Sequence, residues 1–168
     1  MNSAPQSPQD ELLAAVRAAK QQNAENQIAD TTAAMANEAL QSGDARKAAE
    51  LYRQALAKNP SSAVTHYNLA LALARSGDKP GERAALEKAV ALQPGFAPAR
   101  NQLGLVLMGQ PAVAEAHFRA AIESDPNFAE AHNNLGVLLS QQGRAAEAIG
   151  HFQRAVEANP KYAQALVN

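Results

Sequence analysis

Several classes of residue recur at a step of about 34 positions, and this period constrains the fold more than any other feature of the chain. Four prolines keep this step, with spacings of 34, 32 and 34 residues: Pro60, Pro94, Pro126 and Pro160. A row of large residues (Tyr52, Leu86, Phe118, Phe152) and a row of small ones (Ala55, Ala89, Ala121, Ala155) follow it too. Such a period predicts an array of helix–turn–helix units that stack to share one core.

The period divides most of the chain into four units, 29–62, 63–96, 97–128 and 129–162. The third unit is two residues short. Leu107 and Ala114 keep the phase of their neighbours, so the deletion is expected between them, in the turn between the two helices.

Turn and cap residues predict where the helices begin and end. Gly43, Gly77 and Gly143 follow first helices, as a left-handed C-cap requires, and Asp44 and Asp78 come next as N-caps of second helices. Each second helix runs to a proline that cannot continue it. The expected helices are 29–42, 45–58, 63–76, 80–92, 97–108, 112–124, 129–142 and 145–158.

Alanine supplies 40 of the 168 residues, and it is the best helix former and poor in strands. The fold is therefore predicted to be all-α, with about four antiparallel helix pairs plus an N-terminal helix. The absence of Cys excludes a disulfide scaffold and a thiolate metal site. A net charge of −1 offers no basic footprint for nucleic acid, and no apolar run approaches the roughly 18 residues of a membrane span.

The two ends lie outside the complete units. Residues 1–28 begin with a tail and then a helix start, Ser7-Pro8, followed by an apolar face of Leu12, Leu13 and Val16. This helix either caps the first unit or is an arm that docks on a neighbouring molecule, and it either continues to Gly43 or breaks near 23–26. Residues 163–168 repeat the opening of unit four, so we expect a further, truncated helix there, from a longer array. An open end of this kind favours end-to-end association.

The opening residues 1–5 carry no positive charge and no apolar stretch, so they are not a secretory signal peptide. The compartment stays open between the cytoplasm, the default, and the periplasm, if an upstream signal has been removed.

These rows resemble the tetratricopeptide repeat family. The fourth unit carries the pattern most fully: His132, Leu135, Gly136, Leu139, Ala148, Phe152, Ala155 and Pro160. The family prefers Trp where His132 stands. The first unit departs most, with Thr32, Met35, Ala36 and Ala39 in place of large residues, and Glu82 occupies a slot that is Ala48 and Ala148 elsewhere. The resemblance covers about 134 of the 168 residues and implies that the helix pairs form a right-handed α-solenoid.

No residue pattern predicts catalysis, a cofactor or a metal site. His66 and His132 share one large-residue slot and are expected to pack between helices, whereas His117 and His151 are expected on a partly exposed face. No two His have the i, i+4 spacing of a helical metal site, and no catalytic motif is present. We therefore predict that the chain is not an enzyme.

The first helices carry two adjacent rows of amide side chains. One row contains Ala34, Asn68, Gln102 and Asn134, and the other contains Ala33, Tyr67, Asn101 and Asn133. Buried amides need partners, so two such rows are unlike a core, and aligned amides can pair with the backbone of a peptide. The alternative is that these residues have a packing or capping role on a helix surface. The first row resembles the asparagine ladder in the repeat region of O-linked N-acetylglucosamine transferases, whose catalytic domain is absent here.

The other wall of the predicted groove is apolar, with Leu40, Leu71, Leu105 and Val137. Some members of the family bind an acidic chaperone tail through a clamp of Lys, Asn and Arg. Asn37 and Asn68 match its asparagines, but its cationic positions hold Ala33, Pro98 and Gln102, so no acidic chaperone tail is expected to bind. The predicted partner is a protein or peptide, and neither nucleic acid nor a membrane.

Two functions remain as hypotheses. The first is a protein–protein interaction scaffold that binds an extended or short helical peptide in the concave groove. The residues expected to contact it are Asn37, Tyr67, Asn68, Leu71, Asn101, Gln102, Leu105, Asn133, Asn134 and Val137. The second is a structural or self-assembly module, a spacer or multimeriser that forms a homo-oligomer through the open ends of the solenoid.

Overall fold

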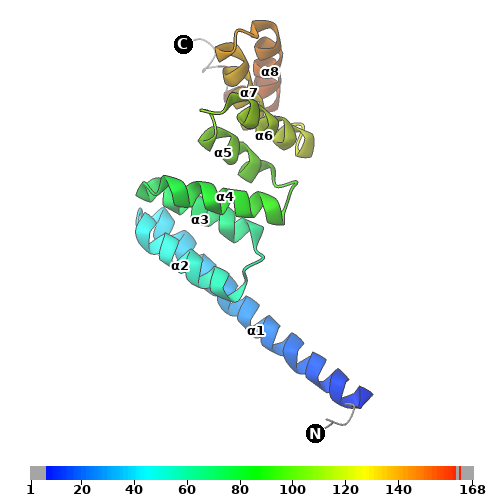
Figure 1. The fold of residues 1–168 in the computed structure, drawn as a ribbon. Helices are drawn as coiled ribbons and strands as arrows, with labels where there is room; N and C mark the ends of the chain where they lie inside the picture. The colour runs from blue at the N-terminus through cyan, green and yellow to red at the C-terminus, as the bar shows by residue number, and fades with distance from the viewer. Residues whose placement is uncertain (1–6, 162, 164–168) are drawn as a thin grey trace.

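The computed structural model describes residues 7–161 and 163, and in this part of the chain all regular structure is helical (Figure 1). Eight helices form four successive pairs: α1 (Pro8–Gln41), α2 (Ala45–Lys58), α3 (Ala63–Ser76), α4 (Lys79–Leu92), α5 (Ala97–Val106), α6 (Pro111–Ser124), α7 (Ala129–Gln141) and α8 (Ala145–Ala158). The predicted all-α solenoid is confirmed. The helix expected at 163–168 falls, apart from Ala163, outside the described residues. None of the described helices is both long and apolar enough to cross a membrane.

Caps at the predicted positions separate the helices. The side chain of Asp44 accepts a hydrogen bond from the backbone N–H of Lys47 at 3.0 Å, and Asp78 does the same for Gly81 at 2.9 Å. The three glycines that follow first helices all have positive φ angles, of 90°, 86° and 77° for Gly43, Gly77 and Gly143. Because L-residues rarely adopt this conformation, glycine is what allows the tight turn within each of these pairs.

The row of large residues forms the centre of the core. Tyr52, Leu86 and Phe118 are fully buried, and small residues face them. A Cβ atom on Gly104 would lie 2.6 Å from Phe118 Cε1, and one on Gly136 would lie 2.7 Å from Phe152 Cε1. These rings therefore pack directly against the backbone of the first helix of their own pair.

The third pair shows where the two missing residues were removed. We expected a first helix over 97–108 and a shortened turn, but α5 ends at Val106. The last turn of α5 is lost, because Pro111 begins α6 and α6 keeps the position that the second helix has in the other pairs. Leu107 keeps its core position, with 5% of its surface exposed.

The N-terminal helix does not break near 23–26 but continues unbroken from Pro8 to Gln41. Its first part, residues 8–24, extends beyond α2 as a separate arm and is exposed throughout (Figure 1). Leu12, Leu13 and Val16 expose 66%, 50% and 43% of their surface. Residues 8–24 therefore do not form the expected cap, since they cover no apolar surface of the first pair.

Candidate functional site

The candidate site is the surface formed by α1, α3, α5 and α7, the first helices of the four pairs. The row that holds Asn68, Gln102 and Asn134, here called the amide row, is half-buried along this surface. Beside it lies an apolar row, with Leu71 half-buried and Leu105 and Val137 exposed. Asn37 is exposed at the α1 end of the apolar row, and its Oδ1 accepts a hydrogen bond from the hydroxyl of Tyr52. The predicted residues thus all lie on first helices, and none of them is charged.

Asn101 differs from the prediction, because it is buried, with 7% of its surface exposed. Its Oδ1 accepts a hydrogen bond from Asn134 Nδ2 at 3.0 Å, which joins α5 to α7. Asn101 therefore belongs to the packing between two pairs, and Asn134 supports it. Of the second row, Asn133 is half-buried and lies nearer the solvent than Asn101.

Gln102 is bonded within the protein as well. Its Nε2 lies 3.4 Å from Oε1 of Glu82 on α4, and Glu82 Oε2 also pairs with Lys79 Nζ at 3.1 Å. Glu82 is buried, with 2% of its surface exposed. Its place in a slot that holds alanine in other units is therefore made tolerable by a lysine and an amide donor.

Tyr67 stands at the edge of the site. Its ring packs edge-to-face against Phe96, with ring centroids 5.2 Å apart. Burial raises the pKa of the Tyr67 hydroxyl above its usual value, and the carboxylate of Glu130 on α7 raises it further. The hydroxyl therefore stays protonated and able to donate a hydrogen bond throughout the neutral range.

Few charges border the two rows. Arg75, at the end of α3, donates from Nη1 to the backbone oxygen of Leu40 at 3.1 Å. The positions where a carboxylate clamp would need cations hold Ala33, Pro98 and Gln102, none of them charged. The surface is thus suited to uncharged polar and apolar contacts.

The histidines have a structural role that the sequence patterns did not reveal. The Nε2 atoms of His66 and His132 lie 3.1 Å from the carbonyl oxygens of Pro60 and Pro126, and Arg100 donates to Pro94 in the same way. A carbonyl oxygen only accepts, so Nε2 of each histidine carries a proton. In the second, third and fourth units, one side chain thus ties the preceding loop to the first helix. The equal six-residue step from each proline to its partner was the available sequence signal.

His132 also contacts the second helix of its own pair, since its Nδ1 lies 3.0 Å from Nδ1 of His151 on α8. Burial lowers the pKa of His151 below its usual value, and the neighbouring His132 and Arg119 lower it further. Burial is likewise the main cause of the lowered pKa of His66 and of His117. Within the described residues, no three His, Asp or Glu side chains are arranged to hold a metal ion.

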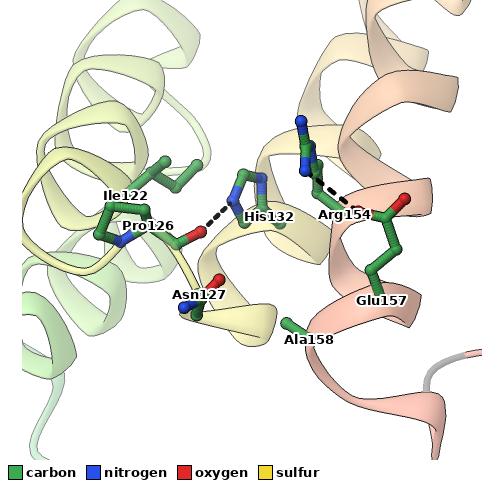
Figure 2. Close-up of a pocket in the computed structure, with 7 residues that line it drawn as sticks. All are labelled: Ile122, Pro126, Asn127, His132, Arg154, Glu157 and Ala158. Carbon is green, nitrogen blue, oxygen red and sulfur yellow. Dashed lines mark hydrogen bonds and ion pairs between the residues drawn. The ribbon is translucent and has the colours of Figure 1, made fainter.

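A pocket of about 410 Å³ lies between the end of α6, the following loop and the end of α8 (Figure 2). Its lining includes Ile122, Pro126 and His132. Figure 2 shows two of its polar side chains engaged within the protein, His132 with the Pro126 carbonyl and Arg154 with Glu157. This pocket lies apart from the amide row, and its lining indicates no particular ligand.

Comparisons with known proteins agree with this fold. A family model described as tetratricopeptide repeat matches residues 33–95 and 105–163. The crystal structure of MamA is similar over 81% of each chain, at 27% identity and a TM-score of 0.72. YrrB, described as a TPR protein with an unusual peptide-binding site, is 24% identical over 82% of this chain and 72% of its own, with a TM-score of 0.69.

A third similar structure is the first TPR of Spaghetti (RPAP3) bound to the HSP90 peptide SRMEEVD. It is 22% identical over 70% of this chain and 95% of its own, with a TM-score of 0.67. No curated protein matches the sequence.

Proposed function

The chain belongs to the tetratricopeptide repeat family, and we propose that it binds an uncharged, extended or short helical peptide segment on the face of its first helices. The family and its peptide-binding neighbours support a role in protein–protein interaction. The observation that carries the finer proposal is the pairing of an amide row with an apolar row along the first helices, with no charged residue in either row.

The two rows provide different contributions to binding. Asn and Gln side chains offer both a donor and an acceptor, so they can pair with the backbone of a peptide whatever its sequence. Leu71, Leu105 and Val137 supply apolar contact for its side chains. This combination selects for an apolar, uncharged segment more than for a defined motif.

The RPAP3 structure provides a contrast. Its bound peptide, SRMEEVD, contains three acidic residues by its printed letters. On this chain the corresponding cationic positions hold Ala33, Pro98 and Gln102, and burying unpaired carboxylates there would be costly. We therefore do not expect an acidic tail of this kind to bind.

A double substitution tests the proposal. Peptides are selected from a phage-displayed library of random 12-residue sequences on the wild-type chain, and the affinity of a synthetic binder is measured by calorimetry. Asn68→Ala with Asn133→Ala should weaken binding about ten- to hundredfold, since two hydrogen bonds are lost. Asn134 is left intact, because its removal would leave the buried Asn101 without its donor.

The matched control is Gln54→Ala with Gln153→Ala, which removes two exposed amides from second helices. It should bind as the wild type does, and both double variants should keep the wild-type helicity and melting temperature. Equal affinity of the wild type and the Asn68/Asn133 variant would refute peptide binding by these amide side chains of the first helices.

A self-assembly module is the second candidate, and the exposed arm of α1 favours it. Leu12 and Val16 lie four residues apart and leave an apolar stripe without a partner in the described chain. Sedimentation over a wide concentration range tests this function. A wild-type mass that rises with concentration would support it, provided that the Leu12→Ser/Val16→Ser variant stays a monomer. A monomer at every concentration would exclude it.

A further inference from the structure

Glu82 is the one fully buried carboxylate among the described residues, and it occupies a slot made for a small side chain. The equivalent residues of the other three units are Ala48, Ala114 and Ala148, each at most 2% exposed. A buried charge is costly unless hydrogen bonds and a counter-charge compensate for it. The position of Glu82 therefore calls for an explanation beyond packing.

Glu82 has two contacts, and one of them is with Gln102 of the amide row. Lys79, whose side chain is 73% exposed, pairs with Oε2, and Gln102 approaches Oε1 with its Nε2. A carboxylate paired with lysine only accepts hydrogen bonds, so Gln102 must turn its NH₂ group toward Glu82. The planar amide then directs its oxygen away from the carboxylate.

The other residues of the amide row have no such carboxylate beside them. The spacing of 20 residues from Glu82 to Gln102 places Ala48 at the same step before Asn68, and Ala114 at the same step before Asn134. Neither alanine can orient an amide. The third unit alone thus has an amide whose orientation is set from the preceding second helix.

We propose that Glu82 is a positioning residue that fixes the orientation of the Gln102 amide, so that Oε1 of Gln102 faces away from Glu82 and a bound peptide must present a backbone N–H to this oxygen. Backbone N–H and C=O groups alternate along an extended chain, so one fixed acceptor sets the register of the peptide along the amide row. This specificity rests on the proposed peptide binding and defines its hydrogen-bond polarity.

An ester scan tests the polarity. The 12-residue binder selected on the wild-type chain is synthesised with each backbone N–H replaced in turn by an ester oxygen, which removes one donor and keeps the shape. One of these esters should cost about five- to tenfold in affinity for the wild type. The same ester should cost nothing when Gln102→Ala has removed the acceptor.

The decisive variant is Glu82→Gln, in which the new amide can donate to Gln102 and allow it to turn. The cost of that ester should then fall below about twofold. Glu82→Ala, which installs the residue of the other units, should act in the same way if Glu82→Gln folds poorly. Glu87→Gln on the same helix removes an exposed carboxylate instead and should keep the full ester cost.

The outcomes separate this inference from the binding function. An ester cost that persists unchanged in both Glu82 variants refutes the positioning role, and so does a scan in which no ester responds to Gln102→Ala. Failure of the wild type to select any peptide, or binding that ignores the Asn68/Asn133 variant, refutes the proposed function itself.

Discussion

Gly104 offers a sharp test of how the core is packed, because its hydrogen atom faces the ring of Phe118. A Cβ atom there would lie 2.6 Å from Cε1 and 2.8 Å from Cδ1 of that ring, closer than real Cβ contacts occur. Phe118 is fully buried, so its ring has no free space to move into. Gly104→Ala must therefore shift α5 relative to α6.

Two opposing terms set the size of the effect. Overpacking of a tight core costs about 1–3 kcal/mol. Alanine recovers about 0.5–1 kcal/mol, because it is the better helix former. The net loss is therefore at most about 2.5 kcal/mol, which for a chain of this length lowers the melting temperature by up to roughly 10 °C.

Two further glycines provide matched comparisons by circular dichroism melting. Gly150 lies inside α8 with nothing within 4 Å of its Cβ position, so Gly150→Ala should be stabilising by about 0.5–1 kcal/mol. Gly136→Ala meets Phe152 at 2.7 Å, but this ring is only half-buried and can move, so its effect should fall between the other two. Melting temperatures that rise equally in the Gly104 and Gly150 variants would refute the argument from ring packing.

Three more predictions concern other parts of the chain. Glu82→Ala should leave the melting temperature unchanged or raise it by a few degrees, because a buried charge is replaced by the residue of the other units; a fall of more than about 5 °C would contradict this. Burial lowers the pKa of His66, His117 and His151, so the unfolded chain binds protons more readily; stability should be greatest above pH 7 and fall as the pH drops through 6.5 toward 5. The drop in melting temperature should shrink when all three are replaced by Gln, and an unchanged drop would assign it to other groups. Backbone amides of residues 10–24 should exchange their hydrogens far faster than those of 30–41, because the arm is exposed throughout. Equal protection of the two segments would show that something covers the arm.

The sequence predicted most of the fold because its information is periodic. The caps at Asp44 and Asp78 and the glycines after first helices locate the helix ends within one or two residues. The predicted end of α5 is two residues too late, since the two missing residues could be taken from the helix or from the turn. The continuity of α1 was left open, because nothing in 23–26 either breaks or requires a helix.

The candidate site was less predictable, because its details depend on contacts between units. An asparagine on a first helix looks the same in sequence whether solvent or another amide faces it. Asn101 is buried because Asn134, in the next pair, donates to it. Gln102 is oriented because Glu82, 20 residues earlier on a different helix, reaches it. Such partners become visible only when the stacking of the pairs is known.

The first unit departs from the family pattern for a physical reason, which appears when its exposed face is compared with the equivalent positions of later units. Leu69, Leu103 and Leu135 are at most 7% exposed, whereas Met35 in the same slot is 52% exposed. The buried alanines at 99 and 131 correspond to the exposed Thr31, and the buried Leu138 corresponds to the exposed Glu38.

Thr31 and Glu38 are thus polar at positions where no earlier helix pair packs in the described chain, which makes this surface more compatible with water. Residues 8–24 are themselves exposed and do not cover this unit. An exposed apolar stripe that is not needed for folding is better explained by a binding role. The arm is therefore where Leu12→Ser with Val16→Ser should change assembly while the melting temperature of the four pairs stays the same.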